Sequence, residues 1–169
     1  MENNAIQQLI EQLYTKRQYR PVVVGVVYDK QRHRVLIGRS AYDPDAWNFV
    51  QGGIKPGEQL EGRLARELYQ EVVIDSCDLD QMTFLSYAQL DYPPKRSPKR
   101  RRGFSRGKAY FGVLVPYHGD GQLQLSPAEL AEARWVTPEE APQYFHQGRT
   151  EKAVFLEKFL KYVPSRINE

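Results

Sequence analysis

The residues of this sequence best suited to chemistry are two glutamates four positions apart, Glu67 and Glu71. They fall within residues 59–73, whose apolar side chains recur with helical spacing, so both carboxylates should lie on one face of a helix, one turn apart. Carboxylates at this spacing repel each other, and a divalent cation that binds both removes the penalty. Hard oxygen ligands suit Mg²⁺ or Mn²⁺ better than Zn²⁺. The spacing therefore indicates a metal site on this helix face.

A second interpretation is an acidic helix face in solvent, with Arg63 and Arg66 forming ordinary surface ion pairs to the glutamates. The segment before the helix bears on the choice. It contains Gly52, Gly53 and Gly57, and glycine permits backbone conformations that other residues resist. A glycine-rich loop can wrap close to the carboxylate face, which favours the metal site over the solvated face.

The order of these residues resembles the signature of the Nudix hydrolases. That signature is a glycine, five residues, a glutamate, seven residues, Arg-Glu-aliphatic, one residue, Glu-Glu, one residue, a glycine and an aliphatic residue. The positions that match in register are Gly52, Glu58, Arg66, Glu67, Leu68, Glu71 and Ile74. Two positions depart from it: Gln70 stands where the first paired glutamate belongs, and Val73 stands where glycine is usual. Because an amide brings an oxygen but no charge, Gln70 predicts weaker binding of at least one metal ion.

The resemblance continues outside the helix and points to the subgroup of RNA pyrophosphohydrolases and diadenosine tetraphosphate hydrolases. The segments that carry it are residues 19–21, 47–53, 92–96, 107–111 and 129–136. It implies an α/β fold, a Nudix-like α/β/α sandwich with a mixed β-sheet, formed by a single domain over residues 1–169. Residues 1–18 would be a helical extension and residues 93–107 a basic loop.

The resemblance also implies a reaction, the metal-dependent attack of water on a phosphorus atom of a nucleoside-linked polyphosphate. It assigns catalysis to Glu67, Glu71 and Glu129, with Glu132 as the alternative to Glu129. Mg²⁺, or Mn²⁺ in its place, would be held by Gly52, Glu67, Gln70, Glu71 and Glu129. Phosphate groups would be bound by Arg20, Gln51, Lys95, Arg96, Arg102 and Lys108. Glu58 and Arg66 would brace the loop against the helix.

The charge distribution bears on the substrate. The formal net charge is +3, yet residues 95–108 contain eight basic residues and no acidic one, so the rest of the chain is acidic. Such a cluster attracts phosphates, and a nucleic acid can use many of these contacts at once. This favours RNA as the substrate, whereas a solvated, self-repelling loop remains the alternative. Tyr92, Tyr110 or Phe145 could stack a base, although core packing is the more common role for each.

The remaining pattern predicts the scaffold. Strands are expected at residues 21–28, 34–38, 82–90, 108–115 and 133–136, and amphipathic helices at residues 4–14 and 150–162. Residues 47–57 are expected to form a loop, and Thr137 to be the N-cap of a further helix. One cysteine excludes an internal disulfide, and no apolar run is long enough to span a bilayer. We expect a cytoplasmic monomer or homodimer with no membrane or DNA partner.

Three functions fit these features. The first is hydrolysis of the 5′ end of triphosphorylated RNA or of dinucleoside polyphosphates. The second is hydrolysis of a small nucleotide, such as a nucleotide sugar or a modified triphosphate. The third is a catalytically weak module that binds RNA or a nucleotide, for which Gln70 is the supporting feature.

Overall fold

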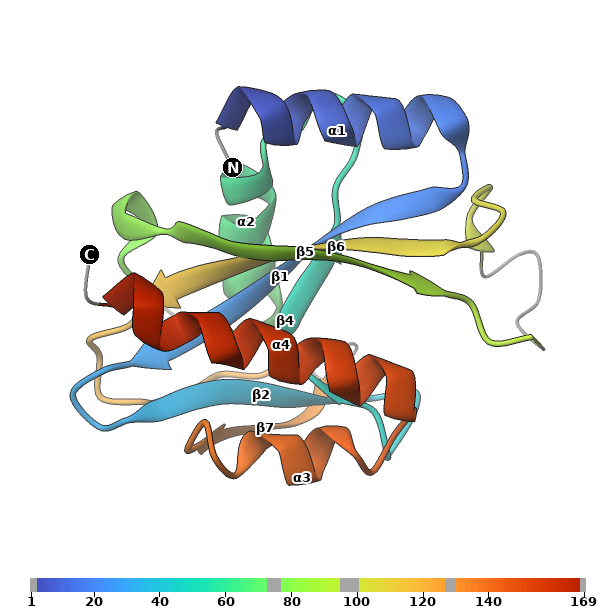
Figure 1. Ribbon diagram of the computed structural model, residues 1–169. Coiled ribbons are helices and arrows are strands. Elements are labelled where there is room, and N and C mark those ends of the chain that lie inside the picture. Colours follow the sequence, from blue (N-terminus) through green and yellow to red (C-terminus); the bar gives the residue numbers. More distant parts are fainter. Residues whose placement is uncertain (1–2, 73–76, 95–100, 127–129, 168–169) are drawn as a thin grey trace.

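The computed structural model describes residues 3–72, 77–94, 101–126 and 130–167, and their strands form one mixed sheet (Figure 1). The strand order is β3-β2-β1-β6-β5, with β4 also paired to β1 and β7 to β2. β1 and β6 run parallel and the other pairs are antiparallel. The strands are β1 (Tyr19–Asp29), β2 (Arg34–Ser40), β3 (Trp47–Asn48), β4 (Val50–Gly53), β5 (Thr83–Asp91), β6 (Gly107–Pro116) and β7 (Leu130–Val136).

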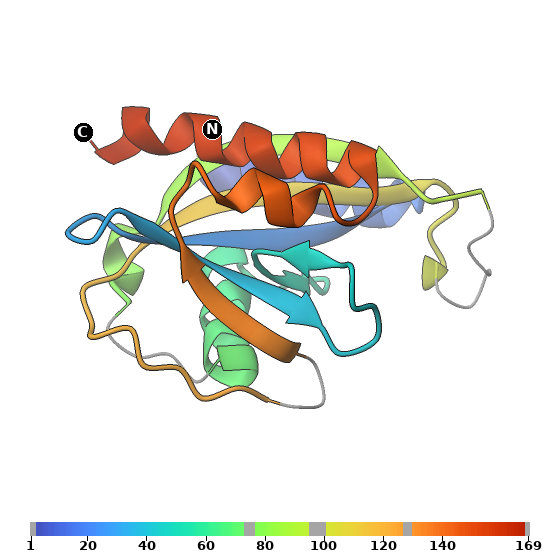
Figure 2. The same ribbon diagram turned by 90° about the horizontal axis from the view of Figure 1, so that it is seen from below.

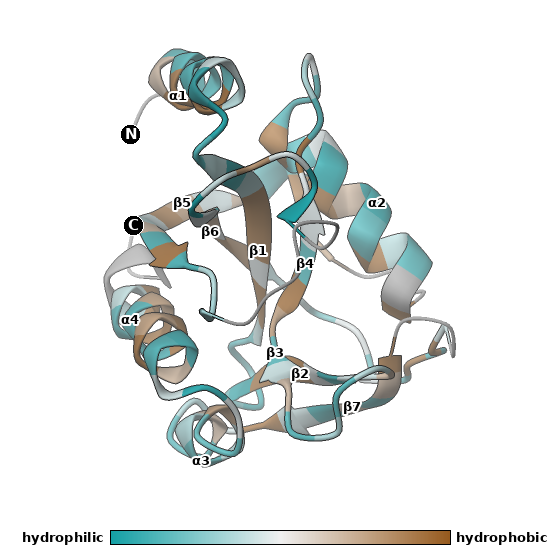
Figure 3. Ribbon diagram, turned by 90° about the vertical axis from the view of Figure 1, so that its right-hand side faces the viewer, coloured by the Kyte–Doolittle hydropathy of each residue, from teal (hydrophilic) through white to brown (hydrophobic). Residues whose placement is uncertain are grey.

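Helices cover both faces of this sheet (Figure 3). α1 (Asn3–Lys16) and α2 (Leu60–Val72) lie on one side, while α3 (Ala141–Phe145) and α4 (Thr150–Ile167) lie together on the other (Figure 2). A short 3₁₀ helix, η1 (Leu79–Gln81), precedes β5. The expected α/β/α sandwich with a mixed sheet is therefore confirmed.

The central strand β1 explains why two helical layers are needed. Val22, Val24 and Val26 point into the core shared with α3 and α4. Val23 and Val27 point into the core shared with α1 and α2. Because successive strand side chains alternate between faces, an apolar run along β1 must be covered on both sides.

The prediction of a loop at residues 47–57 is wrong in its first half. Trp47–Asn48 and Val50–Gly53 are strands, and β4 pairs with β1 so that Gly52 faces Val23 and Gly53 faces Val22. Strands this short, with few apolar side chains, have no readable alternation in the sequence. Their pairing with β1 comes from long-range contacts, and it fixes the glycines against the centre of the sheet.

The predicted helix start at Thr137 is also displaced, because α3 begins at Ala141. The expected capping contacts are nonetheless present. The Glu140 N–H donates to Thr137 Oγ1 over 3.2 Å, and the Thr137 N–H donates to Glu140 Oε2 over 3.0 Å. This reciprocal pair fixes the turn that leads into α3.

The N-terminal helix α1 connects two segments that border the site. It buries Ile6, Ile10 and Leu13 against the sheet. The Tyr14 hydroxyl donates to the Ile54 carbonyl, directly after Gly53. The Tyr14 ring also meets the Phe104 ring edge-on, with centroids 5.5 Å apart. In this way α1 holds the end of β4 and the segment that precedes β6.

The turn between β1 and β2 is built on a buried carboxylate, Asp29, which has no exposed surface. It accepts hydrogen bonds from Arg34 Nε at 2.9 Å and from the backbone N–H of Arg32 at 3.2 Å. Burial alone would raise the pKa of Asp29. The hydrogen bonds from Arg34 and Arg32 outweigh it, so the pKa lies below its ordinary value of 3.8.

We expect Asp29→Asn to lower the free energy of unfolding by about 3 kcal/mol at pH 7, since it leaves Arg34 without its buried partner. A carboxyl whose pKa is lowered in the folded state contributes its stability above the unfolded pKa, and loses it as the pH falls through the folded pKa. The difference between wild type and variant should therefore shrink below about pH 4. Urea unfolding at pH 7 and pH 3, with the exposed Asp80→Asn as control, measures this. An equal difference at both pH values would contradict it.

Candidate active site

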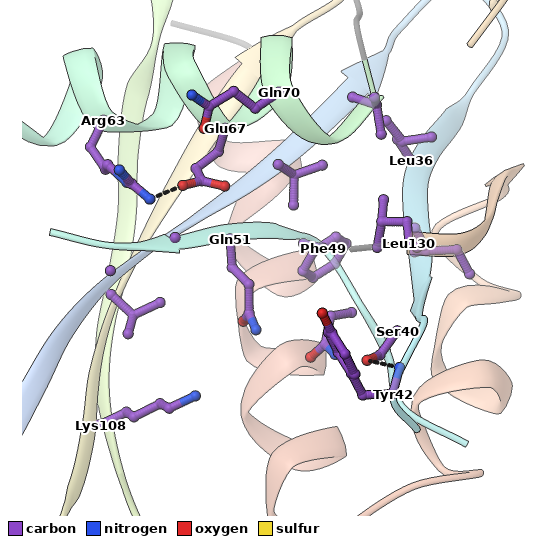
Figure 4. Close-up of a pocket in the computed structure, with 18 of the residues that line it drawn as sticks. Leu36, Ser40, Tyr42, Phe49, Gln51, Arg63, Glu67, Gln70, Lys108 and Leu130 are labelled. Carbon is purple, nitrogen blue, oxygen red and sulfur yellow. Dashed lines mark hydrogen bonds and ion pairs between the residues drawn. The ribbon is translucent and has the colours of Figure 1, made fainter. Parts of the chain in front are cut away.

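A cavity of about 320 Å³ opens between β4, α2 and the strands β1, β2 and β6 (Figure 4). Its described lining brings together residues from distant parts of the chain. The expected site residues that line it are Arg20, Gln51, Gly52, Glu67, Gln70, Arg102 and Lys108. Strands of the sheet position Arg20, Gln51, Gly52 and Lys108. Helix α2 positions Glu67 and Gln70, and the segment before β6 positions Arg102.

Glu67 is held by the packing of α2. Leu60, Leu64, Leu68 and Val72 bury one side of the helix, and this rotation turns Glu67 toward β4 with only 4% of its surface exposed. A Cβ atom on Gly52 would lie 2.4 Å from the Glu67 carboxyl carbon and 2.4 Å from Oε1. The carboxylate thus occupies the space that any side chain at position 52 would need.

The neighbouring Gly53 leaves space for the side chain of Arg20 in the same way. A Cβ atom on Gly53 would lie 2.0 Å from Arg20 Nη2. Arg20 comes from β1, where it is the register partner of Lys108 on the parallel strand β6. Burial lowers the pKa of Arg20 from its ordinary value, and the positive charge of Arg102 lowers it further. This half-buried cation among cations is placed to bind an anion.

Arg63 also lies in the cavity, where its guanidinium forms an ion pair with Glu67 Oε1. Figure 4 shows Arg63, Glu67 and Gln70 extending from α2 on the same side, with the Gln70 amide beside Glu67. The interpretation of Arg63 as an ordinary surface partner of the glutamates is wrong in one respect. The pair exists, but both side chains are largely buried within the site, with 18% of Arg63 and 5% of Glu67 exposed.

Glu58 and Arg66 lie outside the described lining of the cavity and pair with each other. Glu58 Oε2 also accepts the backbone N–H of Lys55 at 2.9 Å. Burial alone would raise the pKa of Glu58, but the hydrogen bonds from Lys55 and Arg66 outweigh it and hold the pKa below its ordinary value. The pair ties the segment after β4 to α2, and so fixes how far Gly52 lies from Glu67.

Several expected site residues fall outside the described part of the chain. These are Glu129, Lys95, Arg96 and the side chain of Glu71, and Val73 and Ile74 of the signature. Glu132, the alternative to Glu129, lies in β7, where it pairs with Arg39 at 3.5 Å and also with Arg134. It is absent from the described lining of the cavity.

The donor atoms of the cavity fit a hard divalent cation. Glu67 supplies a carboxylate and Gln70 an amide, whereas the Gln51 side chain extends from β4 away from both (Figure 4), and its buried Oε1 has no hydrogen-bond partner. Oxygen donors of this kind suit Mg²⁺ or Mn²⁺. Within the described residues, no group of three or more His, Cys, Asp or Glu side chains gathers as a metal site. A complete ligand set would therefore need donors beyond the described part, such as Glu71 or Glu129.

The aromatic residues proposed for base stacking have other positions. Tyr110 and Phe145 are buried in the core, and the Tyr92 hydroxyl donates to the Arg101 carbonyl at 2.9 Å. Tyr42, which was not among the expected stacking residues, lines the cavity with 85% of its surface exposed. The available signal was its setting in a polar turn between strands, where an aromatic ring has no core to fill.

Of the basic segment, the structure describes residues 101–108, and two of their four basic side chains reach the cavity. Arg102 and Lys108 line it, whereas Arg101 and Arg106 lie over the rings of Tyr92 and Tyr19, at 5.5 Å and 5.2 Å. A second cavity of about 240 Å³ shares Asn48 and Lys108 with the first and is also lined by Arg149 and Lys152. Its lining also includes Asp43, Asp45 and Asp91, so the second cavity carries charges of both signs.

Comparison with known proteins gives matches over most of the chain. The NUDIX domain family model matches residues 18–159. The chain is 34% identical over 134 residues to an RNA pyrophosphohydrolase from Novosphingobium aromaticivorans, covering 73% of this chain and 81% of the relative. It is 28% identical over 151 residues to one from Nitratiruptor, covering 87% and 94%.

Solved structures support the fold. The dihydroneopterin triphosphate pyrophosphohydrolase of E. coli superposes with a TM-score of 0.65 at 19% identity, covering 90% of this chain and 99% of that one. An Ap4A hydrolase of C. elegans in a binary complex gives 0.62 at 23% identity, covering 86% and 98%. None of the helices in the described ranges has the length and apolar character needed to cross a bilayer.

Proposed function

Because this chain belongs to the Nudix family and is a Nudix pyrophosphohydrolase, we propose that it removes pyrophosphate from 5′-triphosphorylated RNA, or cleaves dinucleoside polyphosphates, with Mg²⁺ as its ion. The observation that carries this proposal is the lining of the cavity. Four cations line the cavity together with the carboxylate of Glu67, which suits a long anionic polyphosphate: Arg20, Arg63, Arg102 and Lys108. The relatives named RNA pyrophosphohydrolase support RNA as the first choice.

The chemistry follows from the charges in the cavity. Nudix hydrolases generally need divalent metal ions. When bound, such an ion neutralises phosphate charge and activates water as a nucleophile. Glu67 and Gln70 would hold it from α2, while Arg20 and Lys108 hold phosphate oxygens from the two parallel strands. Catalysis of this type depends mainly on positioning and charge stabilisation, and the rigid β1–β4–α2 unit supplies both.

Two further cations beside the first cavity favour RNA over a small nucleotide. The second cavity shares Asn48 and Lys108 with the first, and Arg149 and Lys152 line it beside three aspartates. A nucleotide whose first phosphates lie near Glu67 would extend its next phosphate toward these cations. Polymer phosphates gain from several such contacts, whereas a single nucleotide does not.

A competition assay tests the proposal. Purified full-length protein is mixed with 5′-triphosphorylated RNA and diadenosine tetraphosphate in Mg²⁺ and then in Mn²⁺, and all products are followed, with Glu67→Gln as control. We expect faster turnover of the RNA, and loss of that turnover in the control. Faster cleavage of diadenosine tetraphosphate would mean that the cations of the cavity bind the phosphates of a small substrate and not those of an RNA chain. Preference for a nucleotide sugar or a free triphosphate would contradict both parts of the proposal.

Gln70 should set the metal requirement. We expect Gln70→Glu to lower the Mg²⁺ concentration for half-maximal activity about tenfold, because it adds a negative charge beside Glu67. Titration of activity with Mg²⁺ and with Mn²⁺ measures this. Gln59→Glu adds the same charge at an exposed position outside the described lining and should leave the requirement unchanged. If both variants behave alike, position 70 does not act on the metal.

Tyr42 should recognise the nucleoside. We expect Tyr42→Ala to weaken binding of a nucleoside triphosphate about tenfold, since stacking of a base on an aromatic ring contributes about 1–3 kcal/mol. Affinity for inorganic tripolyphosphate, which has no base, should stay the same. Tyr42→Phe keeps the ring and should bind both like wild type. Equal loss for both probes in Tyr42→Ala would show that the residue shapes the loop and does not stack.

A further inference from the structure

The ion pair between Arg63 and Glu67 lies where a divalent cation is expected. Arg63 donates to Oε1 of a carboxylate that is 5% exposed, and its own Nε is buried with no hydrogen-bond partner. This contact differs from the Arg66 pair, since Arg66 is half-exposed and meets Glu58 outside the described lining. The charge of Arg63 is therefore paired with Glu67, a carboxylate that lines the cavity.

A guanidinium and a divalent metal ion that bind the same carboxylate oxygen weaken each other's binding. A guanidinium within contact distance stabilises the carboxylate charge, and a divalent ion must offset that stabilisation to bind. Conversely, a guanidinium released from Glu67 remains inside a cavity lined by Arg20, Arg102 and Lys108. Its next available anion would be the polyphosphate itself.

We propose that Arg63 and the divalent metal ion compete for Glu67, so that metal binding transfers the Arg63 guanidinium from the carboxylate to the substrate phosphates. This inference rests on the proposed function for the class of substrate, but not for the competition itself. In the metal-free protein Arg63 neutralises Glu67 and takes little part in phosphate binding. In the metal-bound protein it is a phosphate ligand. Metal and polyphosphate then favour each other's binding to the same extent, because such coupling is reciprocal.

Direct binding measurements test the competition without any turnover. Mn²⁺ affinity of the full-length chain is measured by electron paramagnetic resonance of the free ion, for wild type, Arg63→Gln and Arg102→Gln. The second variant removes the same charge from the same cavity but does not break the Glu67 pair. We expect Arg63→Gln to bind Mn²⁺ about tenfold more tightly, the order of effect of one opposite charge in contact. Arg102→Gln should change the affinity less than threefold. Arg63→Lys keeps a positive charge and should fall between wild type and Arg63→Gln.

The second measurement uses inorganic tripolyphosphate as the probe, by calorimetry. Without metal, Arg102→Gln should weaken its binding several-fold, while Arg63→Gln leaves it within twofold of wild type. At Mn²⁺ concentrations that saturate protein and probe, both variants should bind about five- to tenfold more weakly. Circular dichroism confirms the fold of each variant, and the rise in melting temperature caused by Mn²⁺ should be largest for Arg63→Gln.

Two results would overturn the inference. Unchanged or weaker Mn²⁺ binding in Arg63→Gln would mean that Arg63 positions Glu67 for the metal. Equal tightening in Arg63→Gln and Arg102→Gln would mean that only the general field of the cavity matters. Neither binding measurement depends on hydrolysis of RNA. A failure of this inference can therefore be distinguished from a failure of the proposed function, which the competition assay tests.

Discussion

Replacing Gly52 by alanine is expected to lower kcat/KM about 100-fold with little loss of stability. The added methyl group would lie 2.4 Å from the carboxyl carbon of Glu67, so the end of that side chain must move by about an ångström. A displacement of this size at a catalytic group costs about 100-fold in rate. The fold should tolerate it, because the atoms that must move are the end of a side chain and not backbone.

Gly62→Ala is the matched control for this experiment. Gly62 lies in α2, the same helix as Glu67, and a methyl group there meets nothing within 4 Å. Since alanine is a better helix former than glycine, this variant should keep full activity and gain about 0.5–1 kcal/mol of stability. Steady-state kinetics and thermal unfolding of both variants are the measurements. Comparable activity in Gly52→Ala and Gly62→Ala would show that the close approach of Gly52 to Glu67 is not needed for activity.

The second large effect is expected at Arg20. Arg20→Met should raise KM for a nucleoside polyphosphate at least 30-fold, because it removes a half-buried cation of the cavity, a loss of about 2 kcal/mol of charge-assisted hydrogen bonding. The same change should leave the melting temperature unchanged or raise it by a few degrees. The reason is that Arg20 lies among the like charges of Arg102 and Arg63 and is destabilised by its own burial.

Arg39→Met provides the comparison, since Arg39 lies on β2, outside the described lining, and pairs with Glu132. It should leave KM within twofold of wild type and should not raise the melting temperature. Differential scanning fluorimetry and initial-rate kinetics at fixed ionic strength measure both quantities. A marked fall in the melting temperature of Arg20→Met would show that Arg20 supports the fold, and would contradict its assignment as a phosphate ligand.

The residues that were predictable from sequence are those whose neighbours lie on the same element. Glu67 and Gln70 share one turn of a helix whose apolar face is evident, so their common orientation follows from helical geometry. The central strand at residues 21–28 was likewise evident from its valines. β3 and β4 were not, because strands of two and four residues have no measurable alternation, and β4 is stabilised by its pairing with β1.

The placement of Arg63 and Tyr42 depended on tertiary structure. Arg63 has the same helical spacing to Glu67 whether the pair faces solvent or the sheet, and only the distance between α2 and β4 decides which. Tyr42 lies in an irregular turn, where no periodicity relates it to the cavity. Tyr110 and Phe145 had the apolar surroundings typical of core residues, and the structure places them in the core.

Helix α1 packs on the sheet but lies outside the region that the family model matches. The family model begins at residue 18, so a chain shortened to the matched region would lose the whole helix. It would lose the Tyr14 contacts to the Ile54 carbonyl and the Phe104 ring, and would expose the apolar side chains that α1 covers. The segment after β4 and the segment before β6 would then lose their connection through Tyr14. Helix α1 connects the segment after β4 to the segment before β6. A domain boundary taken from the family match would exclude this helix.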